Sequence, residues 1–240
     1  MVLKRVILVT PVFRRFEMTR LMLEQRVRTF EAARRLGVEC GCVVIGDDAN
    51  LAVAEKLGFH VIEAPNRLGS KYNDGHEFAV NDGWDFSFQV NSDQVFDPEL
   101  LVALSGCPDD QLIRTVWLSA AYRDGRKFIS YRNPLWAMKA YPTKLLESVP
   151  RPCQEDAMSM CDSLVHAGVI HAHPSLETHT VVVGPLETIQ FESGQQLTPW
   201  KRHLYAGMLD STFETSVPWP AIADIHGGDF VAKMKEFYQA

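Results

Sequence analysis

The sequence has no uninterrupted apolar run near the roughly 20 residues that span a bilayer. The apolar run in its N-terminal stretch, MVLKRVILVTPVF, is about five residues long and too short for a signal peptide. Low-complexity tracts, repeats and linker-like segments are also missing, which indicates a globular protein. The five cysteines are odd in number and follow no repeating pattern, so we expect reduced thiols and a cytoplasmic protein. Cys40 and Cys42 lack the usual zinc or redox spacing, and we expect them to be buried.

Two glycine-rich nucleotide motifs are absent as well. The segment that follows the first expected strand, VTPVFRRFEM, contains no glycine, so there is no dinucleotide fingerprint, and no P-loop occurs elsewhere. A bound nucleotide must therefore be held by something other than a glycine cradle. The missing loop also argues against a nucleotidyltransferase, which usually carries a glycine-rich, arginine-containing loop after its first strand.

Charge is distributed unevenly along the chain. Residues 1–35 contain nine Lys and Arg against three Glu, a net charge of +6, so the rest of the chain carries −12 of the total of −6. A local basic face could contact phosphate, and a solvated helix face is the alternative. The acidic remainder argues against wrapping a long nucleic acid.

Hydrophobic patterning predicts an α/β fold. Strands are expected at RVILVT, CGCVVIG, HVIEAP and FSFQV, the first two of them buried, with helical segments between them at Phe16–Phe30, LAVAEKLG and NDGHEFAVNDG. This alternation predicts a doubly wound, Rossmann-like sheet. Further along we expect a hairpin around Asp124-Gly125, helices at PTKLLESV and EDAMSMCDSLVHAG, late strands at VIHAH and THTVVVG, and a final helix at GDFVAKMKEFYQ. The result is one mixed, mainly parallel sheet flanked by helices in a single domain, residues 1–240.

Polar side chains follow four consecutive expected strands where each strand ends. Ligands of open α/β sheets bind outside the carboxyl ends of the strands, so this convergence predicts a binding site. The turn at 91–93 could instead be an Asx turn, and the aspartates after the second strand could cap the next helix. The residues are Thr10, the pair Asp47 and Asp48, the pair Asn66 and Arg67, and the turn Asn91-Ser92-Asp93.

Six short motifs occur in a fixed order between residues 5 and 180: VTPVFRR, VVIGDDAN, NRLGSKYNDG, VNSDQ followed by Pro-Glu-Leu, QEDAMSMCDSLVHAG and HPSLETH. This ordered set resembles the GT-A-fold glycosyltransferases, and is most similar to their family 2. The resemblance implies that residues 1–100 bind a nucleotide-sugar, that residues 101–185 face the acceptor, and that residues 186–240 hold a closing loop and the final helix.

The resemblance also implies a divalent cation, Mn²⁺ or Mg²⁺, that bridges the two phosphates of the donor. Asp93 matches the second Asp of the family's D-x-D motif, and Asn91 replaces the first, which removes a negative charge. His179 matches the late metal ligand, while His203 and His226 are competitors, and His171 and His173 are expected to face solvent.

The remaining implied site residues bind the donor or take a proton. Asp47 matches the residue that accepts a hydrogen bond from the donor's base, which favours UDP. The implied donor-binding set is Thr10, Pro11, Arg14, Asp47, Asp48, Asn66, Lys71 and Ser92. Asp156, with Glu155 as the lesser candidate, occupies the position of the general base of an inverting transfer. Asp156 as a helix cap, and Arg14 and Lys71 as plain surface charges, are the alternatives.

The expected function is therefore metal-dependent, inverting transfer of a hexosyl or pentosyl group from a nucleotide-sugar to an acceptor hydroxyl. The acceptor could be a glycan, a small molecule or a modified base in DNA, for which the basic N-terminal helix would be suited. A non-catalytic protein that binds nucleotide-sugars or carbohydrates is the alternative of another class.

Overall fold

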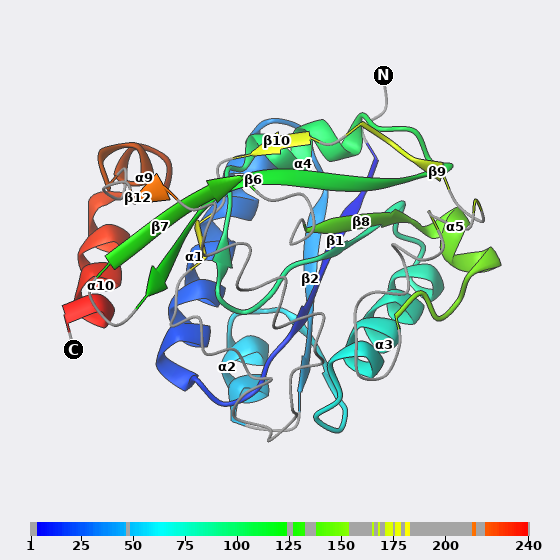
Figure 1. Cartoon of the computed structure of the whole chain (residues 1–240). Coiled ribbons are helices and arrows are strands. Elements are labelled where there is room, and N and C mark those ends of the chain that lie inside the picture. Colours follow the sequence, from blue (N-terminus) through cyan, green and yellow to red (C-terminus); the bar gives the residue numbers. More distant parts are fainter. Residues whose placement is uncertain are drawn as a thin grey trace, which may run out of the picture.

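The computed structural model describes residues 4–46, 49–123, 127–132, 138–153, 165, 168, 171–174, 176–178, 181–182, 213–214 and 219–239. Strands and helices alternate over the first hundred residues, as the hydrophobic pattern predicts (Figure 1). The strands are β1 (Val6–Pro11), β2 (Cys40–Gly46), β3 (His60–Glu63) and β4 (Phe86–Gln89), followed by the short β5 (Gln94–Val95). The helices are α1 (Phe16–Arg35), α2 (Asn50–Lys56), α3 (Leu68–Asn81) and α4 (Glu99–Ser105).

One mixed sheet organises the chain. The strands β3, β2, β1 and β4 are neighbours in that order and all parallel. On the far side of β4 the sheet continues with antiparallel pairings through β8 (Lys139–Pro142), β6 (Gln111–Arg123) and β7 (Lys127–Arg132) to β12 (Phe213–Glu214). The short strands β9 (His171–Ala172) and β10 (Leu176–Thr178) pair with β6, and β11 (Val181–Val182) pairs with β5. The predicted hairpin and the mixed, mainly parallel sheet are confirmed.

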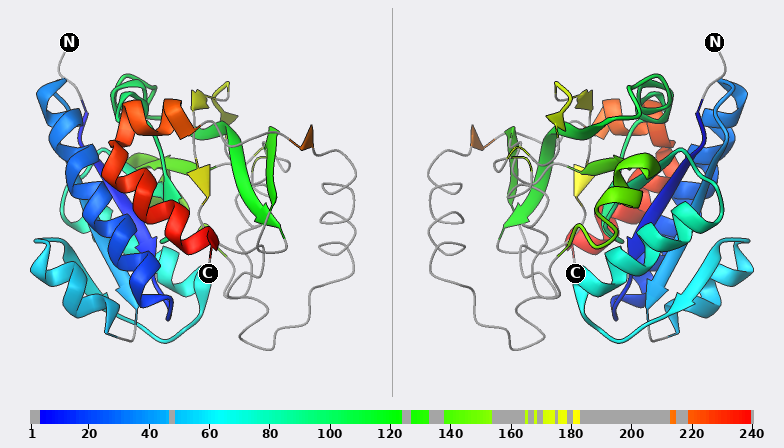
Figure 2. Two further views of the ribbon diagram at one scale, coloured as in Figure 1. Left: turned by 90° about the vertical axis from the view of Figure 1, so that its left-hand side faces the viewer. Right: turned by 90° about the vertical axis from the view of Figure 1, so that its right-hand side faces the viewer.

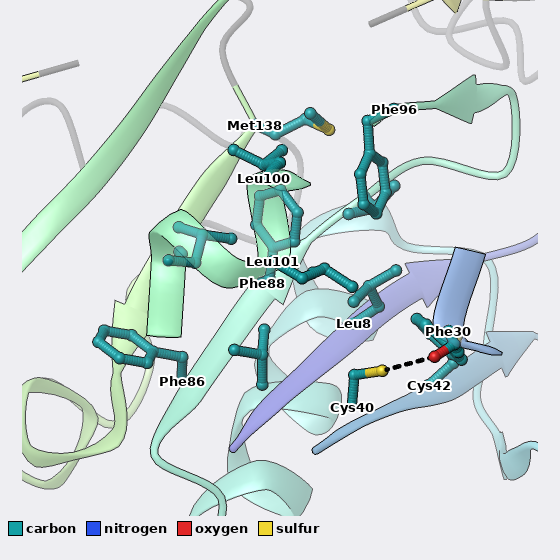
Figure 3. Packing of buried hydrophobic residues seen from close by; sticks show 14 of the residues in the cluster. Leu8, Phe30, Cys40, Cys42, Phe86, Phe88, Phe96, Leu100, Leu101 and Met138 are labelled. Carbon is teal, nitrogen blue, oxygen red and sulfur yellow. Dashed lines mark hydrogen bonds between the residues drawn. The ribbon is translucent and has the colours of Figure 1, made fainter. Parts of the chain in front are cut away.

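Side chains of β1 alternate between two hydrophobic layers, because successive residues of a strand point to opposite faces. Val6 and Leu8 belong to the core under α1, α2 and α4, and Ile7 and Val9 to the core under α3. Both faces of β1 are buried, which explains why its sequence is a continuous apolar run. Figure 3 shows the first layer, in which Leu8, Phe88, Phe96 and Leu101 pack together.

The cysteines of β2 are small buried groups in this layer. Cys40 and Cys42 are 2% and 4% exposed, and the Cys40 thiol donates to the carbonyl oxygen of Phe30 on α1 (Figure 3). Burial raises the pKa of the Cys40 thiol to about 11, so this thiol stays protonated at neutral pH. The expectation that the pair is buried is confirmed.

Two C-terminal helices cover the outer side of α1. These are α9 (Trp219–His226) and α10 (Gly228–Gln239), and Figure 2 shows α10 lying along α1. Met22 of α1 packs with Ile222, Phe230 and Met234 in a separate hydrophobic cluster. Sequence analysis predicted α10 but not α9.

Three sequence-based expectations need correction or stay open. The third helix begins at Leu68, five residues earlier than predicted, so the NRLGSKYNDG motif is largely helical. Phe16 is 47% exposed and does not belong to the buried stripe of α1. The helix expected at EDAMSMCDSLVHAG falls largely outside the described residues. The helix α5 (Thr143–Ser148) is present as expected, and no helix in the described part of the chain is long and apolar enough to cross a membrane.

Candidate functional site at the carboxyl ends of β1 and β4

The order in which strands join the sheet changes side at β1. From β1 the sheet grows outward through β2 and β3, and β4 then adds to the opposite side of β1. Such a switch point leaves a crevice outside the carboxyl ends of the two adjacent strands. Thr10 and Pro11 end β1, and Asn91 follows β4, so the two predicted segments meet there.

A buried arginine joins these two segments. Arg26 of α1 is only 2% exposed, and its guanidinium donates hydrogen bonds to Thr10 Oγ1 and to the backbone oxygen of Asn91. Burial lowers the pKa of Arg26, with Asp93 among the groups that oppose this effect. Its Nε has no hydrogen-bond partner among the described residues. Arg26 therefore places a positive charge at the carboxyl ends of β1 and β4.

The turn after β4 is fixed by neighbouring side chains. The Asn91 side-chain oxygen accepts a hydrogen bond from the Tyr72 hydroxyl at 2.6 Å, and the Asn91 N–H donates to Gln94 Oε1 at 2.8 Å. Ser92 is buried. Asp97, not Asp93, accepts a hydrogen bond from the Glu99 N–H at the start of α4. Helix capping therefore does not account for Asp93.

Asp93 faces the connection between β1 and α1. One carboxylate oxygen, Oδ2, lies 3.2 Å from Arg15 Nη1, and the other, Oδ1, is buried without a hydrogen-bond partner in the described parts of the chain. Burial raises the pKa of Asp93, and Arg15 opposes that rise. An unsatisfied buried carboxylate oxygen is costly, which is typical of a site prepared for a ligand.

The connection itself adopts an uncommon backbone conformation. Arg14 and Arg15 have φ angles of 51° and 50°, and residues other than glycine rarely adopt such values. Arg15 precedes the first turn of α1 and makes no side-chain capping bond. The Asn50 amide donates to the Arg14 carbonyl oxygen at 2.9 Å and supports this conformation. Backbone strain of this kind gathers at functional sites.

Lys71 supports the same connection from α3. It is 1% exposed, and its ammonium group donates to the Val12 carbonyl oxygen at 2.8 Å and to Asn66 Oδ1 at 3.1 Å. The ammonium also lies 5.6 Å from the centre of the Phe13 ring. A plain surface charge is therefore ruled out for Lys71, which ties Asn66 to the end of β1.

A second buried network anchors the chain just before the predicted general base. The Asn73 amide makes two hydrogen bonds to the backbone of Cys153, at 2.8 Å and 3.0 Å. Gln89, the last residue of β4, donates to the Cys153 thiol and lies 3.0 Å from His76 Nε2. The structure thus fixes residue 153 beside the end of β4. Glu155 and Asp156 follow, but they lie outside the described residues, as do Asp47, Asp48, His179 and His203.

Among the described histidines, His226 was a competitor for the late metal ligand, and it packs between helices instead. His226 is 5% exposed, lies 2.9 Å from Gln25 Nε2 and contacts Phe230 between the helices, so it is a structural residue. Burial lowers its pKa to about 4. His171 is exposed, as expected, and His173 is half-buried.

The described residues fit the implied metal ion poorly. Both oxygens of Asn91 already accept hydrogen bonds, and Asp93 Oδ2 is paired with Arg15. Over the described ranges, no three His, Cys, Asp or Glu side chains form a group that could hold a metal. Mg²⁺ and Mn²⁺ prefer several oxygen ligands, and two guanidinium groups beside a single carboxylate oppose a divalent cation.

Three residues of this site were not predicted. Arg26 lies on the buried stripe of α1, four residues after Met22 and four before Phe30, and a charged residue at such a position is a signal that could have been recognised. Arg15 follows the first strand together with Arg14, in a region that could contact the diphosphate, but it is not in the predicted donor-binding set. Tyr72 lies within the NRLGSKYNDG motif but was given no role there, and its contact with Asn91 depends on the folded structure.

Comparisons with known proteins support the fold. No protein-family model matches the chain, and no curated protein matches it significantly. It is similar to the structure of a proposed nucleotide-diphospho-sugar transferase from Desulfovibrio desulfuricans G20, with 12% identity and a TM-score of 0.50 over 98% of this chain and 96% of the other. It is also similar to the inositol-1-phosphate CTP transferase of T. maritima, with 10% identity and a TM-score of 0.50 over 85% and 96%. The chain therefore has the Rossmann-like α/β fold seen in transferases that use nucleotides or nucleotide-sugars.

Proposed function

We propose that this protein is a glycosyltransferase that moves a sugar from a nucleoside diphosphate sugar to an acceptor hydroxyl, with inversion at the anomeric carbon. The observation that carries the proposal is the group of side chains gathered at the carboxyl ends of β1 and β4. There Thr10 and the Asn91–Asp93 turn are joined by Arg26, and Arg15 lies beside Asp93. Cationic groups at the carboxyl ends of parallel strands suit a diphosphate.

The chemistry needs a proton acceptor on the acceptor side. The acceptor oxygen forms a bond to the anomeric carbon while the bond from that carbon to the β-phosphate oxygen breaks, and its electron pair stays on the phosphate. Asp156 takes the proton of the acceptor hydroxyl, with Glu155 as the lesser candidate. The Asn73 and Gln89 contacts to Cys153 support this assignment, because they hold Cys153, three residues before Asp156, near the end of β4.

Nucleotidyl transfer is the competing activity, since the T. maritima neighbour with this fold is a CTP transferase. The connection from β1 to α1 separates the two possibilities. In this chain it has no glycine and places two arginines in a left-handed conformation, instead of a glycine-rich loop around a triphosphate. We therefore favour sugar transfer, with UDP as the first donor nucleotide because of Asp47.

The proposal is tested with Asp156→Asn and a panel of nucleotide-sugars. The thermal midpoint should rise with the correct donor, because ligands that bind the native state stabilise it. Asp156→Asn should lower turnover by about 100- to 10,000-fold, the usual contribution of a general base. Its donor affinity should stay unchanged, and NMR should show a product of inverted anomeric configuration.

Two results would count against the proposal. Retained anomeric configuration would exclude a single displacement with one base. Formation of a nucleotide-sugar from a nucleoside triphosphate and a sugar phosphate would establish the competing nucleotidyltransferase.

Ser92→Ala tests the donor side of the site. Ser92 lies in the turn after β4, so removal of its hydroxyl should raise KM for the donor more than it lowers kcat.

A further inference from the structure

The turn that matches the family's metal motif is already surrounded by the protein's own donors. Tyr72 and Arg26 occupy the two oxygens of Asn91, and Arg15 occupies one oxygen of Asp93. The single carboxylate of this turn therefore faces a guanidinium where the resemblance implies a divalent cation. Two of the groups around it, Arg15 and Arg26, carry a permanent positive charge.

We propose that this protein binds its diphosphate without a divalent cation, with Arg15 contacting the phosphates directly and Arg26 adding positive charge from behind. The inference rests on the proposed function and concerns the same site. Asp93 serves as the anion that holds Arg15 in place until a diphosphate arrives. Arg15 then exchanges a carboxylate for a phosphate, both of which suit its planar fork of N–H donors.

The different surroundings of Arg15 and Arg26 indicate different roles in diphosphate binding. The Arg15 side chain retains 12% exposure and stands at the start of α1, so it can turn toward a ligand. Arg26 is buried and bonded to Thr10 and Asn91, so it stays in place and acts through its charge and through those two residues. Arg26 is therefore a positioning residue, and Arg15 is the direct ligand of the diphosphate.

The exchange of Arg15 from Asp93 to the diphosphate would also leave the Asp93 carboxylate oxygens available to the donor. Its Oδ1 is buried and lacks a hydrogen-bond partner in the described parts of the chain, and Oδ2 loses its partner once Arg15 turns away. Both oxygens can then accept hydrogen bonds from hydroxyl groups of the donor sugar. A carboxylate that accepts two such bonds is well solvated inside the site.

The test is isothermal titration of UDP, GDP, CDP and TDP into the full chain, once with EDTA and once with Mn²⁺. The wild-type protein should bind its preferred diphosphate equally well in both buffers. Arg15→Gln should weaken binding by about tenfold or more, because it removes a charge-assisted hydrogen bond. Arg20→Gln is the matched control, since Arg20 lies on the same helix, is exposed and pairs with Glu24. It should bind like the wild type.

Asp93→Asn separates the two explanations by the sign of its effect. Without the competing carboxylate, Arg15 is released, so diphosphate binding in EDTA should be unchanged or tighter. Binding that appears only with Mn²⁺, and that Asp93→Asn abolishes, would overturn the inference while leaving the proposed function in place. No binding of any of the four diphosphates in either buffer would refute the proposed function itself. Arg15→Lys gives a second variant, to be used if Arg15→Gln does not fold by circular dichroism.

Discussion

Replacement of Arg26 by methionine tests whether this buried charge is kept for binding rather than for stability. The change removes a weak contact to Cys42 Sγ and two hydrogen bonds from a charged donor to oxygen acceptors, Thr10 Oγ1 and the Asn91 backbone oxygen. Each of these two hydrogen bonds is worth about 1.5–3 kcal/mol. It also removes a buried cation, which costs several kcal/mol to desolvate. Among the described residues no carboxylate forms an ion pair with Arg26, and its Nε is unsatisfied.

These two effects oppose one another. We therefore expect Arg26→Met to change the free energy of unfolding by less than about 2 kcal/mol in urea titrations. Diphosphate affinity should respond more strongly. A charge about 7 Å from a phosphate contributes about 2 kcal/mol at an effective dielectric constant of about 20, so Kd should rise by about 30-fold.

The assay pairs urea unfolding with isothermal titration of the preferred diphosphate for the wild type and the variant. Arg20→Gln again serves as the control, because it changes a charge on the exposed side of the same helix. A loss of more than about 4 kcal/mol in stability with unchanged Kd would refute the reasoning. Arg26 would then be a structural bridge between β1 and β4, and nothing more.

Two further predictions concern stability. Burial lowers the pKa of His226 to about 4 and of His76 to about 3, so the unfolded chain, with a His pKa near 6.5, binds these protons more readily than the folded protein. Stability should therefore be full above pH 6.5 and fall toward pH 4. His226→Gln should remove up to about 3 kcal/mol of that fall, and an identical slope of stability against pH in this variant would contradict the prediction. Gly75→Ala would place a Cβ 2.2 Å from Val9 Cγ1, so it should destabilise by about 1–3 kcal/mol in urea despite the better helix propensity of alanine. Gly228→Ala, which meets nothing within 4 Å, should not destabilise, and equal midpoints for the two alanine variants would contradict the packing of α3 on β1.

Sequence patterns predicted the sheet well because burial on two faces leaves a local signature. The apolar runs of β1 and β2 are such signatures, and both strands lie in the middle of the parallel part of the sheet. The start of α3 was misplaced for a related reason. Glycine and asparagine within NRLGSKYNDG indicate a turn by composition, yet Gly75 serves close packing of a helix against Val9 and Ile45.

The site was only partly predictable, because its contacts join residues far apart in the chain. The strand-end rule located Thr10, Asn91 and Asp93 correctly near one another. It could not reveal that Arg26 bridges Thr10 and Asn91, because Arg26 and Asn91 are 65 positions apart in the sequence. Nor could it reveal the pairing of Arg15 with Asp93, which are 78 positions apart. The motif predicted a metal ligand at Asp93, and the fold places the Arg15 guanidinium beside that carboxylate.

A crystal structure of the protein with the nucleoside diphosphate that binds best tests the central claim most directly. The account predicts the diphosphate at the carboxyl ends of β1 and β4, with the Arg15 guanidinium turned from Asp93 to a phosphate oxygen. A diphosphate bound elsewhere on the chain, with Arg15 still 3.2 Å from Asp93, would contradict it.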